Sequence, residues 1–253
     1  MIIYTKYMNS GLLRCAKYAF SPNQLGYCGP NKNRDLFEYC QTQAADAGLN
    51  NILKDFQTLY PYLSFIAKEN QLQNPFCQAV VDAYWLGNNL LDGITLNNFY
   101  RHLTDTLQLK KKLSKRLFNL VFANFKKPAT PHHNFHVFNI WQRTGNLAAL
   151  HTIETMDKCR ISWAKVKQVL PNGYEVNYQP LTVNSSTNQL DLAVPAKKIV
   201  VKGFVDQAKI GDWISLHWDW PCEMLTNSQV FNLKQYTEKM LGLTDKLISN
   251  YSN

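Results

Sequence analysis

The sequence predicts an α+β fold: an all-α helical bundle followed by a small β-barrel with a C-terminal helix. Throughout the first half, apolar residues recur at the three- and four-residue spacing of helices, without the alternation of strands. From Cys159 onward, short segments alternate apolar and polar side chains and are separated by turn residues. The clearest break between the two patterns is the stretch from Lys127 to Pro131. We therefore expect a helical domain over 1–127, a connector over 128–157 and a strand-rich domain over 158–253.

About six helices are expected in the first half. Ser21-Pro22 should end the first, because proline lacks the N–H that continues a helix. Asn33 is a favourable cap for the second helix, and Gly48 is a favourable end. Asn74-Pro75 combines a cap with a proline in the first turn, where a helix tolerates it. The expected helices cover about 11–20, 34–48, 59–70, 75–92, 96–107 and 110–125.

The second half provides five short strands and a final helix. Pro171-Asn-Gly173 is a hairpin turn signal between the first two strands. Five short strands joined by such turns suit a small closed barrel. Thr226 and Gln229 form a capping box, and the helix that follows has a continuous apolar face. The expected strands start near Cys159, Tyr174, Leu190, Lys198 and Trp213, and the apolar face consists of Val230, Leu233, Tyr236, Met240 and Leu243.

Size and composition exclude several classes of protein. The chain has 253 residues, 45% of them hydrophobic and 18% charged, which is typical of a globular protein and excludes a disordered one. Its six cysteines are scattered and form no CxxC pair, so we expect reduced thiols rather than a disulfide framework. The sequence shows no signal peptide and no long apolar segment, which predicts a cytoplasmic protein with no membrane partner.

The chain carries a net charge of +9, most of it in the first half. The lysine-rich run from Lys110 to Lys127 could meet nucleic-acid phosphates, dock a partner or form a solvated helix face, and the last is the commonest role. Trp213, Trp218 and Trp220 could stack on single strands, although barrel tryptophans usually belong to the core. A nucleic-acid partner is therefore not favoured.

His132, His133 and His136 form the densest cluster of ligand-type side chains. His132 and His136 are four residues apart, which places them on the same face of a helix or a strand. Neutral imidazoles bind iron, zinc, nickel or copper, and two of them with a third ligand make a minimal metal site. All three are candidate metal ligands. If His132 and His136 form the site, their shared face should open into a cavity with a third polar ligand from the helical half, and His133 should then be structural. The alternative is that all three are packed or capping histidines.

Cys28 lies in a loop rich in turn residues, Ser21-Pro-Asn-Gln-Leu-Gly-Tyr-Cys-Gly-Pro30. Gly26 and Gly29 allow such a loop to turn tightly or to approach a ligand closely. We therefore expect Cys28 to face a pocket and to contribute to cofactor binding. A simple connection between helices is the alternative. The other thiols of this half lie within apolar helical patterns and should be buried: Cys15, Cys40 and Cys77.

A cysteine and a histidine stand out in the second half. Cys159 opens Cys-Arg-Ile-Ser-Trp-Ala-Lys-Val166, and His217 lies in Gly211-Asp-Trp-Ile-Ser-Leu-His-Trp-Asp-Trp-Pro-Cys222. A thiolate and an imidazole on neighbouring strands can hold a soft metal. They could also serve as nucleophile and base in acyl transfer, although no third orienting residue is visible, or have no joint role. Cys222 is a weaker candidate for a further ligand.

The order Cys159, Lys165-Val166, Gly211-Asp212, His217 resembles the HypC/HupF family of chaperones that assemble the iron centre of nickel–iron hydrogenases. That family opens with Cys-Leu-Ala-Ile-Pro-Gly-Lys-Val and closes its barrel with Val-Gly-Asp-Tyr-Val-Leu-Val-His. The resemblance implies an OB-like barrel on which Cys159 binds iron, as a carbonyl–cyanide fragment, with support from His217. It also implies that the partners are maturation proteins or the hydrogenase large subunit.

Three phrases spread along the chain also resemble a bacterial family of unknown function: Ser-Pro-Asn-Gln-Leu-Gly-Tyr-Cys, Ala-Tyr-Trp-Leu-Gly-Asn and Pro-His-His-Asn-Phe-His-Val-Phe-Asn. We expect an accessory protein for metallocentre assembly that handles or delivers the iron fragment of a hydrogenase. The first alternative is a metal-dependent oxidoreductase or lyase that uses His132, His133 and His136. The second is a barrel protein that binds single-stranded nucleic acid.

Overall fold

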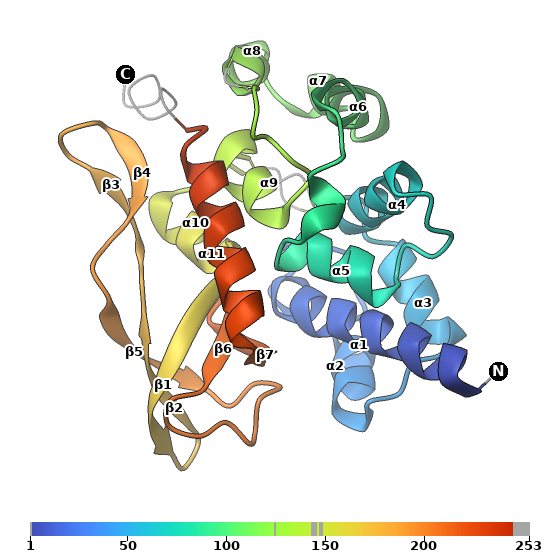
Figure 1. Cartoon of the computed structure of the whole chain (residues 1–253), viewed down its shortest axis with the longest axis vertical. Coiled ribbons are helices and arrows are strands. Elements are labelled where there is room, and N and C mark those ends of the chain that lie inside the picture. Colours follow the sequence, from blue (N-terminus) through green and yellow to red (C-terminus); the bar gives the residue numbers. More distant parts are fainter. Residues whose placement is uncertain (1, 124, 143–145, 147–148, 245–253) are drawn as a thin grey trace.

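The computed structural model describes residues 2–123, 125–142, 146 and 149–244. It combines helices with antiparallel sheets, which confirms the predicted α+β class (Figure 1). Helices occupy the chain as far as Cys159, and strands begin at Ser162. None of the helices described is both long enough and apolar enough to cross a membrane.

The first part of the chain forms a bundle of helices, most of them short, around α5 (Figure 1). In chain order the elements are α1 (Ile2–Gln24), α2 (Asn33–Thr42), α3 (Ala47–Lys54), α4 (Leu59–Glu69), α5 (Gln78–Trp85), the 3-10 turn η1 (Asn89–Leu91), α6 (Leu96–Arg101), the π turn η2 (His102–Thr106), α7 (Leu109–Lys112), α8 (Lys115–Ala123), α9 (His133–Ile140) and α10 (Ile153–Cys159).

Two predicted helices are divided because a capping residue lies within each predicted range. Asp46 accepts hydrogen bonds from the first N–H groups of α3, so a new helix starts inside the range 34–48. Gly48 consequently lies in the first turn of α3 rather than at a helix end. Asn88 caps η1 in the same way, within the range 75–92. Local capping chemistry therefore overrides the apolar periodicity in both places.

The first and last helices of the bundle also differ from expectation. Helix α1 continues past Pro22 to Gln24 instead of ending before the proline. The helix expected over 110–125 is divided into α7 and α8, and Asn124 lies outside the described residues. The connector expected over 128–157 contains two helices, α9 and α10, which position much of the candidate site.

The second half forms a five-stranded antiparallel sheet in the order β5-β2-β1-β6-β7, with β3 and β4 paired separately. The predicted turn at Pro171-Asn-Gly173 joins β1 to β2, whose register runs from Leu170 opposite Gly173 to Ala164 opposite Tyr178. The strands are β1 (Ser162–Leu170), β2 (Gly173–Tyr178), β3 (Leu181–Asn184), β4 (Gln189–Leu192), β5 (Ala196–Val201), β6 (Trp213–His217) and β7 (Trp220–Leu225).

The closed barrel expected from the strand pattern is not found in the described part of the chain. Strands β5 and β7 are the two edges of the main sheet, and they are not hydrogen-bonded to each other. The segment expected to supply a further barrel strand, beginning at Leu190, instead pairs with β3 as a separate hairpin. The main sheet still has five strands, because β7 joins it, but its edges do not pair, so a HypC-like barrel is not confirmed.

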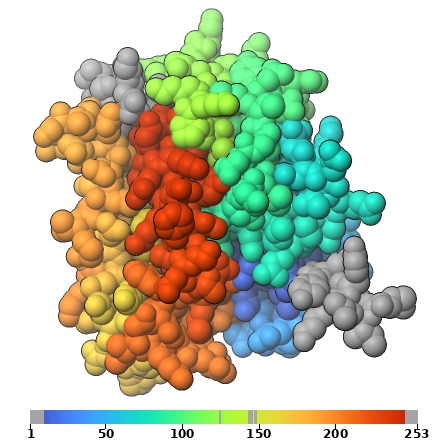
Figure 2. Space-filling view, in the orientation of Figure 1, coloured from blue at the N-terminus to red at the C-terminus, as the bar shows by residue number. Residues whose placement is uncertain are grey.

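Helix α11 (Asn227–Leu241) fills the junction between the sheet and the helices, as the space-filling view shows (Figure 2). Its capping box is formed as predicted: the Thr226 hydroxyl accepts from the Gln229 N–H, and the Gln229 side chain accepts from the Thr226 N–H. The predicted apolar face of this helix is buried. The helix thereby joins both halves of the chain.

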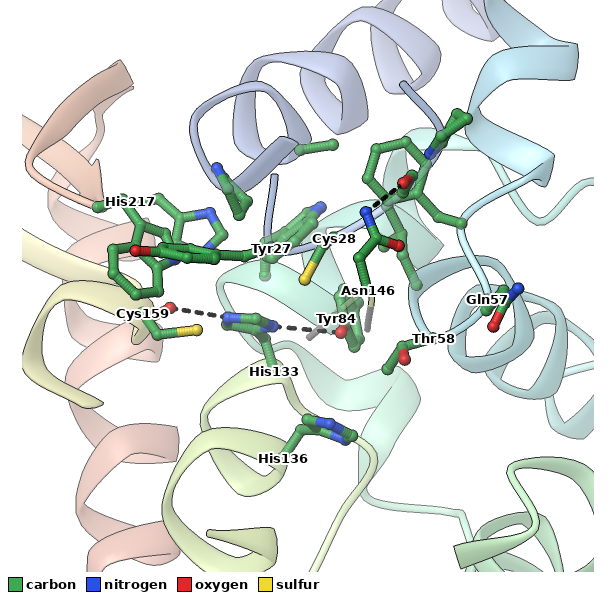
Figure 3. Close-up of a pocket in the computed structure, with 18 of the residues that line it drawn as sticks. Tyr27, Cys28, Gln57, Thr58, Tyr84, His133, His136, Asn146, Cys159 and His217 are labelled. Atoms are coloured by element: carbon green, nitrogen blue, oxygen red, sulfur yellow. Dashed lines mark hydrogen bonds between the residues drawn. The ribbon is translucent and has the colours of Figure 1, made fainter. Parts of the chain in front are cut away.

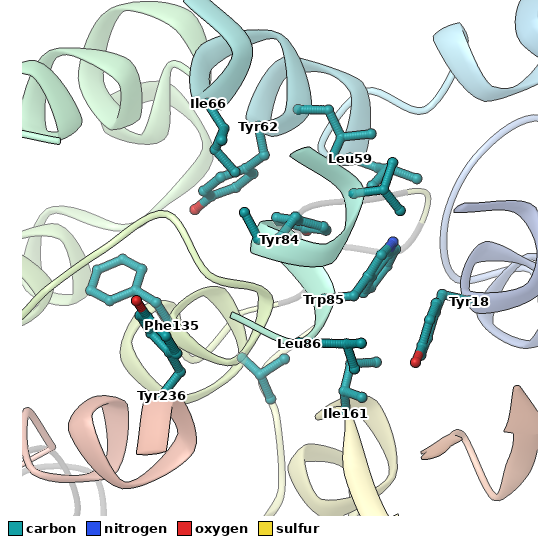
Figure 4. Packing of buried hydrophobic residues seen from close by; sticks show 14 of the residues in the cluster. Tyr18, Leu59, Tyr62, Ile66, Tyr84, Trp85, Leu86, Phe135, Ile161 and Tyr236 are labelled. Atoms are coloured by element: carbon teal, nitrogen blue, oxygen red, sulfur yellow. The ribbon is translucent and has the colours of Figure 1, made fainter. Parts of the chain in front are cut away.

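One continuous hydrophobic core runs from α1 to α11 and includes side chains from both halves (Figure 4). Tyr18 stacks on Trp85 with ring centroids 5.2 Å apart, and Leu86 and Ile161 lie beside them. A smaller cluster, which includes Val176, lies on the sheet itself. The domain boundaries at 127 and 158 remain predictions.

A buried polar network also ties α1 and α5 to the sheet. Arg14 on α1 donates to Asp82 on α5 and, at 2.8 Å, to Glu223 on β7. The Tyr18 hydroxyl lies 2.7 Å from Glu223 and 2.9 Å from the Ser215 hydroxyl on β6. Because each of these groups has a partner, the network fixes the position of α1 against β6, the strand that carries His217.

Candidate metal centre

A cavity of about 320 Å³ lies between the helices and the end of β6. Its walls come from segments far apart in the sequence: the end of α1 and the loop after it, the α3–α4 connection, α5, α9, α10 and β6 (Figure 3). The cavity collects five of the side chains predicted to bind a metal or a cofactor: Cys28, Cys159, His133, His136 and His217.

Cys159 is the last residue of α10, which begins at a capping box formed by Thr152 and Thr155. The side chain is half-buried, and its sulfur points toward the ring of His133 (Figure 3). The predicted strand at Cys159 starts three residues later, at Ser162. The thiol is therefore held at a helix end rather than on a strand.

His217 is the last residue of β6 and is 1% exposed. The turn to β7 is made by Trp218 and Asp219, both with positive φ, as a two-residue hairpin turn requires. The Trp218 N–H donates to the carbonyl of Lys158 at 2.6 Å. This bond joins the residues adjacent to His217 and Cys159, and it explains why the two side chains meet.

The hydrogen bonds of His217 define its protonation. Its Nδ1 lies 2.7 Å from the carbonyl oxygen of Tyr18, and a carbonyl can only accept, so Nδ1 carries the hydrogen. Burial lowers the pKa of His217 well below its usual value, and a repulsive interaction with His133 lowers it further, so the ring is neutral. The lone pair therefore lies on Nε2, a buried atom without a hydrogen-bond partner among the described residues.

His133, the first residue of α9, is held at both ring nitrogens. Its Nε2 donates to the carbonyl of Cys159 at 2.9 Å, and its Nδ1 lies 3.2 Å from the hydroxyl of Tyr84 on α5 (Figure 3). Burial lowers the pKa of His133 to about 4, so this ring is also neutral. An ion bound to His133 would replace one of these two hydrogen bonds.

The ligand atoms of His133, Cys159 and His217 all lie within 4.8 Å of one another. One thiolate and two neutral imidazoles suit borderline or soft transition metals such as zinc, copper and iron. A thiolate–imidazolium pair, which acyl transfer by a cysteine would use, is disfavoured here because burial resists charge on both imidazoles. The chemistry of the three side chains therefore favours metal binding.

The expected pairing of His132 with His136 is not what the structure shows. His132 is the N-cap of α9 and has an extended backbone (ψ 147°). It therefore lies outside the helix and does not share a helical face with His136, although the two are four residues apart. Its Nδ1 accepts the N–H of Asn134, and its ring stacks on Tyr236, away from the cavity. His136 does line the cavity, where its Nδ1 lies 3.2 Å from the Tyr62 hydroxyl. His133, expected to be structural, takes the place predicted for His132.

Cys28 lines the cavity on the wall opposite α10 (Figure 3). The side-chain amide of Asn23 donates to the carbonyls of Cys28 and Pro30, at 2.8 and 2.6 Å. Asn146 donates to the Gly29 carbonyl at 2.8 Å from the other side. The loop is thus fixed by side chains on both flanks, and it presents the thiol to the cavity. Its role in binding a cofactor remains a prediction.

Several cavity residues carry no recognisable signal in the sequence. Tyr84 lies within an apolar helical pattern in the sequence, and its hydrogen-bond partner, His133, is 49 residues away. Asn146 belongs to a connector without periodicity. His151 lines the cavity from the start of the α10 region. Only the folded chain brings these side chains together, and the partners of Tyr84 and Asn146 are distant in sequence.

The three tryptophans considered as a nucleic-acid platform have contacts within the protein. Trp220 packs edge-on against Phe20, and Trp218 packs on Tyr27 beside the cavity. Trp213 is half-buried and lies against the ammonium groups of Lys165 and Lys234. Two of the three rings are therefore used in packing, and the arrangement gives no support to a stacking surface. Cys222 is fully buried and does not line the cavity.

Comparison with known proteins places the whole chain in one family. The model of DUF6390, described as a family of unknown function, matches residues 7–251, so this chain belongs to that family. This confirms the predicted whole-chain resemblance to a family of unknown function. The match gives no support to the HypC/HupF resemblance of the last third. No curated protein and no solved structure matches the chain.

Proposed function

We propose that this member of the DUF6390 family binds a transition-metal ion through Cys159, His133 and His217 and holds it for delivery, as an accessory protein in metallocentre assembly. The observation that carries the proposal is the convergence of three ligand atoms within 4.8 Å. Tetrahedral bonds of about 2.0–2.3 Å place neighbouring ligand atoms about 3.5 Å apart. Side-chain shifts of about an ångström would therefore close the set around an ion.

The electrostatics of the cavity support the proposal. A metal binds the neutral form of imidazole, and burial keeps both His133 and His217 neutral well below pH 7. The Nε2 atom of His217 is buried without a partner among the described residues, which is an unfavourable state for a polar atom unless a ligand compensates it. A metal ion would supply the missing interaction.

Three protein ligands leave at least one coordination position of the metal open, and here that position faces a cavity of about 320 Å³. The cavity has room for small ligands carried on the metal. Together with the HypC/HupF resemblance, this leads us to propose iron as the cargo, with carbonyl and cyanide as its small ligands. Maturation proteins or the hydrogenase large subunit are the proposed partners.

A second function, a metal-dependent oxidoreductase or lyase, is favoured by the same open position. The centre would then be Cys159, His133 and His217 rather than His132, His133 and His136. In an enzyme the metal stays bound through repeated turnovers, whereas an accessory protein releases it to a recipient. Retention of the metal in the presence of an apo-hydrogenase large subunit would favour the enzyme, and transfer would favour the accessory protein.

Anaerobic purification followed by elemental analysis tests the proposed function. The wild-type protein should carry close to one transition-metal ion per chain, and Cys159→Ser should lose it. Cys77→Ser is the matched control, since Cys77 is a half-buried thiol outside the cavity, and it should retain the metal. Infrared bands from carbonyl and cyanide would identify the cargo. Equal metal content in wild type and Cys159→Ser would contradict the proposal.

A further inference from the structure

Helix α1 contains a proline in its last turn, and the proline leaves one carbonyl without its helical donor. In an α-helix the carbonyl of residue i accepts the N–H of residue i+4. The partner position for Tyr18 is Pro22, which has no N–H. Tyr18 is completely buried, so water does not replace the missing donor.

The missing donor is supplied by the candidate site. Nδ1 of His217 donates to the Tyr18 carbonyl at 2.7 Å, across the interface between α1 and β6. The N–H that normally occupies this carbonyl in a helix is missing, because residue 22 is a proline. The bond fixes the hydrogen on Nδ1 and directs Nε2 toward Cys159 and His133.

We propose that Pro22 is a positioning residue for the metal centre. Because Pro22 has no N–H, the Tyr18 carbonyl is free to accept the hydrogen of His217 Nδ1. This bond holds His217 in the tautomer whose Nε2 can bind a metal. The effect on metal binding rests on the proposed function, whereas the effect of Pro22 on the tautomer of His217 does not. Partners that orient a ligating histidine in this way typically change metal affinity 10–100-fold when they are lost.

The proline ring contributes sterically as well as by its missing hydrogen. In a helix interior the ring clashes with the carbonyl four residues earlier and displaces it from the helix axis. The displaced Tyr18 carbonyl thus turns toward the neighbouring strand, where His217 lies. In Pro22→Ala, the alanine N–H would draw that carbonyl back along the axis and compete with His217. The variant should therefore improve the helix and weaken the site.

The test compares wild type with Pro22→Ala, and with Pro61→Ala as the matched control. Pro61 is the third residue of α4, in the first turn, where an N–H has no partner within the helix. The ¹⁵N shifts of His217 report its tautomer in the metal-free protein. Zn²⁺ affinity, measured by competition with a chelator, reports the consequence for the site.

We expect wild type and Pro61→Ala to show His217 protonated on Nδ1, with the same Zn²⁺ affinity. Pro22→Ala should show a mixed or reversed tautomer and bind Zn²⁺ about 10–100-fold more weakly, with no loss of thermal stability. A wild-type ring protonated on Nε2, or an unchanged tautomer in Pro22→Ala, would overturn the inference. If wild type binds no Zn²⁺ but shows the expected tautomers, the proposed function fails and the role of Pro22 in fixing the ring stands.

Discussion

Replacing His132 with asparagine should make the stability of this protein less sensitive to acid. His132 caps α9 by accepting the N–H of Asn134, and it takes no part in the cavity. Asparagine is among the best N-cap residues and can accept the same hydrogen bond. The variant thus keeps the cap and removes the titrating group, and the stacking on Tyr236 that it also loses lowers stability equally at every pH.

The magnitude follows from the pKa of His132, which burial lowers from 6.5 to about 3 in the folded protein. Between these two values the unfolded chain binds the proton and the folded protein does not. The free energy of unfolding therefore falls as the pH drops below about 6.5, and the loss is complete near pH 3. Each pH unit in this window costs about 1.4 kcal/mol, so His132 accounts for about 2 kcal/mol between pH 7 and pH 5.

Urea denaturation at pH 7 and pH 5 measures this difference. Wild type should lose about 2 kcal/mol more than His132→Asn over the interval. Glu223 and Asp82, whose pKa values are raised by burial, act in the opposite direction but equally in both proteins. Thr95→Asn, which changes the N-cap of α6 without removing a titrating group, should follow wild type. An equal pH dependence in wild type and His132→Asn would refute the reasoning.

Three further predictions concern the core and the thiols. Arg14→Met should lower the free energy of unfolding, measured in urea, by about 3–5 kcal/mol, because it leaves Glu223 buried without its cation. Adding Glu223→Gln should recover part of the loss, and no recovery would contradict the explanation. Gly87→Ala should lower the free energy of unfolding, measured in urea, by about 1–3 kcal/mol or more, since its Cβ would lie 2.1 Å from the Tyr236 ring and its φ is +84°. Gly93→Ala places its Cβ in open space and should leave the free energy of unfolding nearly unchanged. Iodoacetamide should modify Cys28 and Cys159 before the buried Cys15 and Cys222, and bound metal should protect Cys159. Mass spectrometry measures the labelling of each thiol. Equal labelling of Cys159 with and without metal would argue against a metal on that thiol.

The sequence predicts well those features that depend on local patterns. The change from helices to strands and the capping box of α11 both follow from periodicity and short-range hydrogen bonding. The closed barrel was wrong because sheet closure depends on which strand pairs with which, and the segment at Leu190 has a closer partner in β3. Alternating side chains are equally compatible with both pairings.

In the candidate site, too, some features could be predicted from the sequence and others could not. The proximity of Cys159 and His217 was expected from a resemblance, and the structure places the two side chains together. The choice among the clustered histidines depended on where α9 begins. Moving that start by one residue changes which ring faces the cavity, and sequence patterns do not locate helix ends so finely. The contribution of Tyr18 was out of reach, because it acts through its backbone carbonyl.

X-ray absorption at the zinc edge of the Zn²⁺-loaded protein tests the central claim, the identity of the ligands, most directly. The three side chains in the cavity predict one sulfur at about 2.3 Å and two imidazole nitrogens at about 2.0–2.1 Å, the distances typical of zinc. Cys77→Ser should show the same sulfur contribution as wild type, and any metal that remains on Cys159→Ser should lack it. A metal coordinated only by oxygen and nitrogen in the wild-type protein would contradict a centre built from Cys159, His133 and His217.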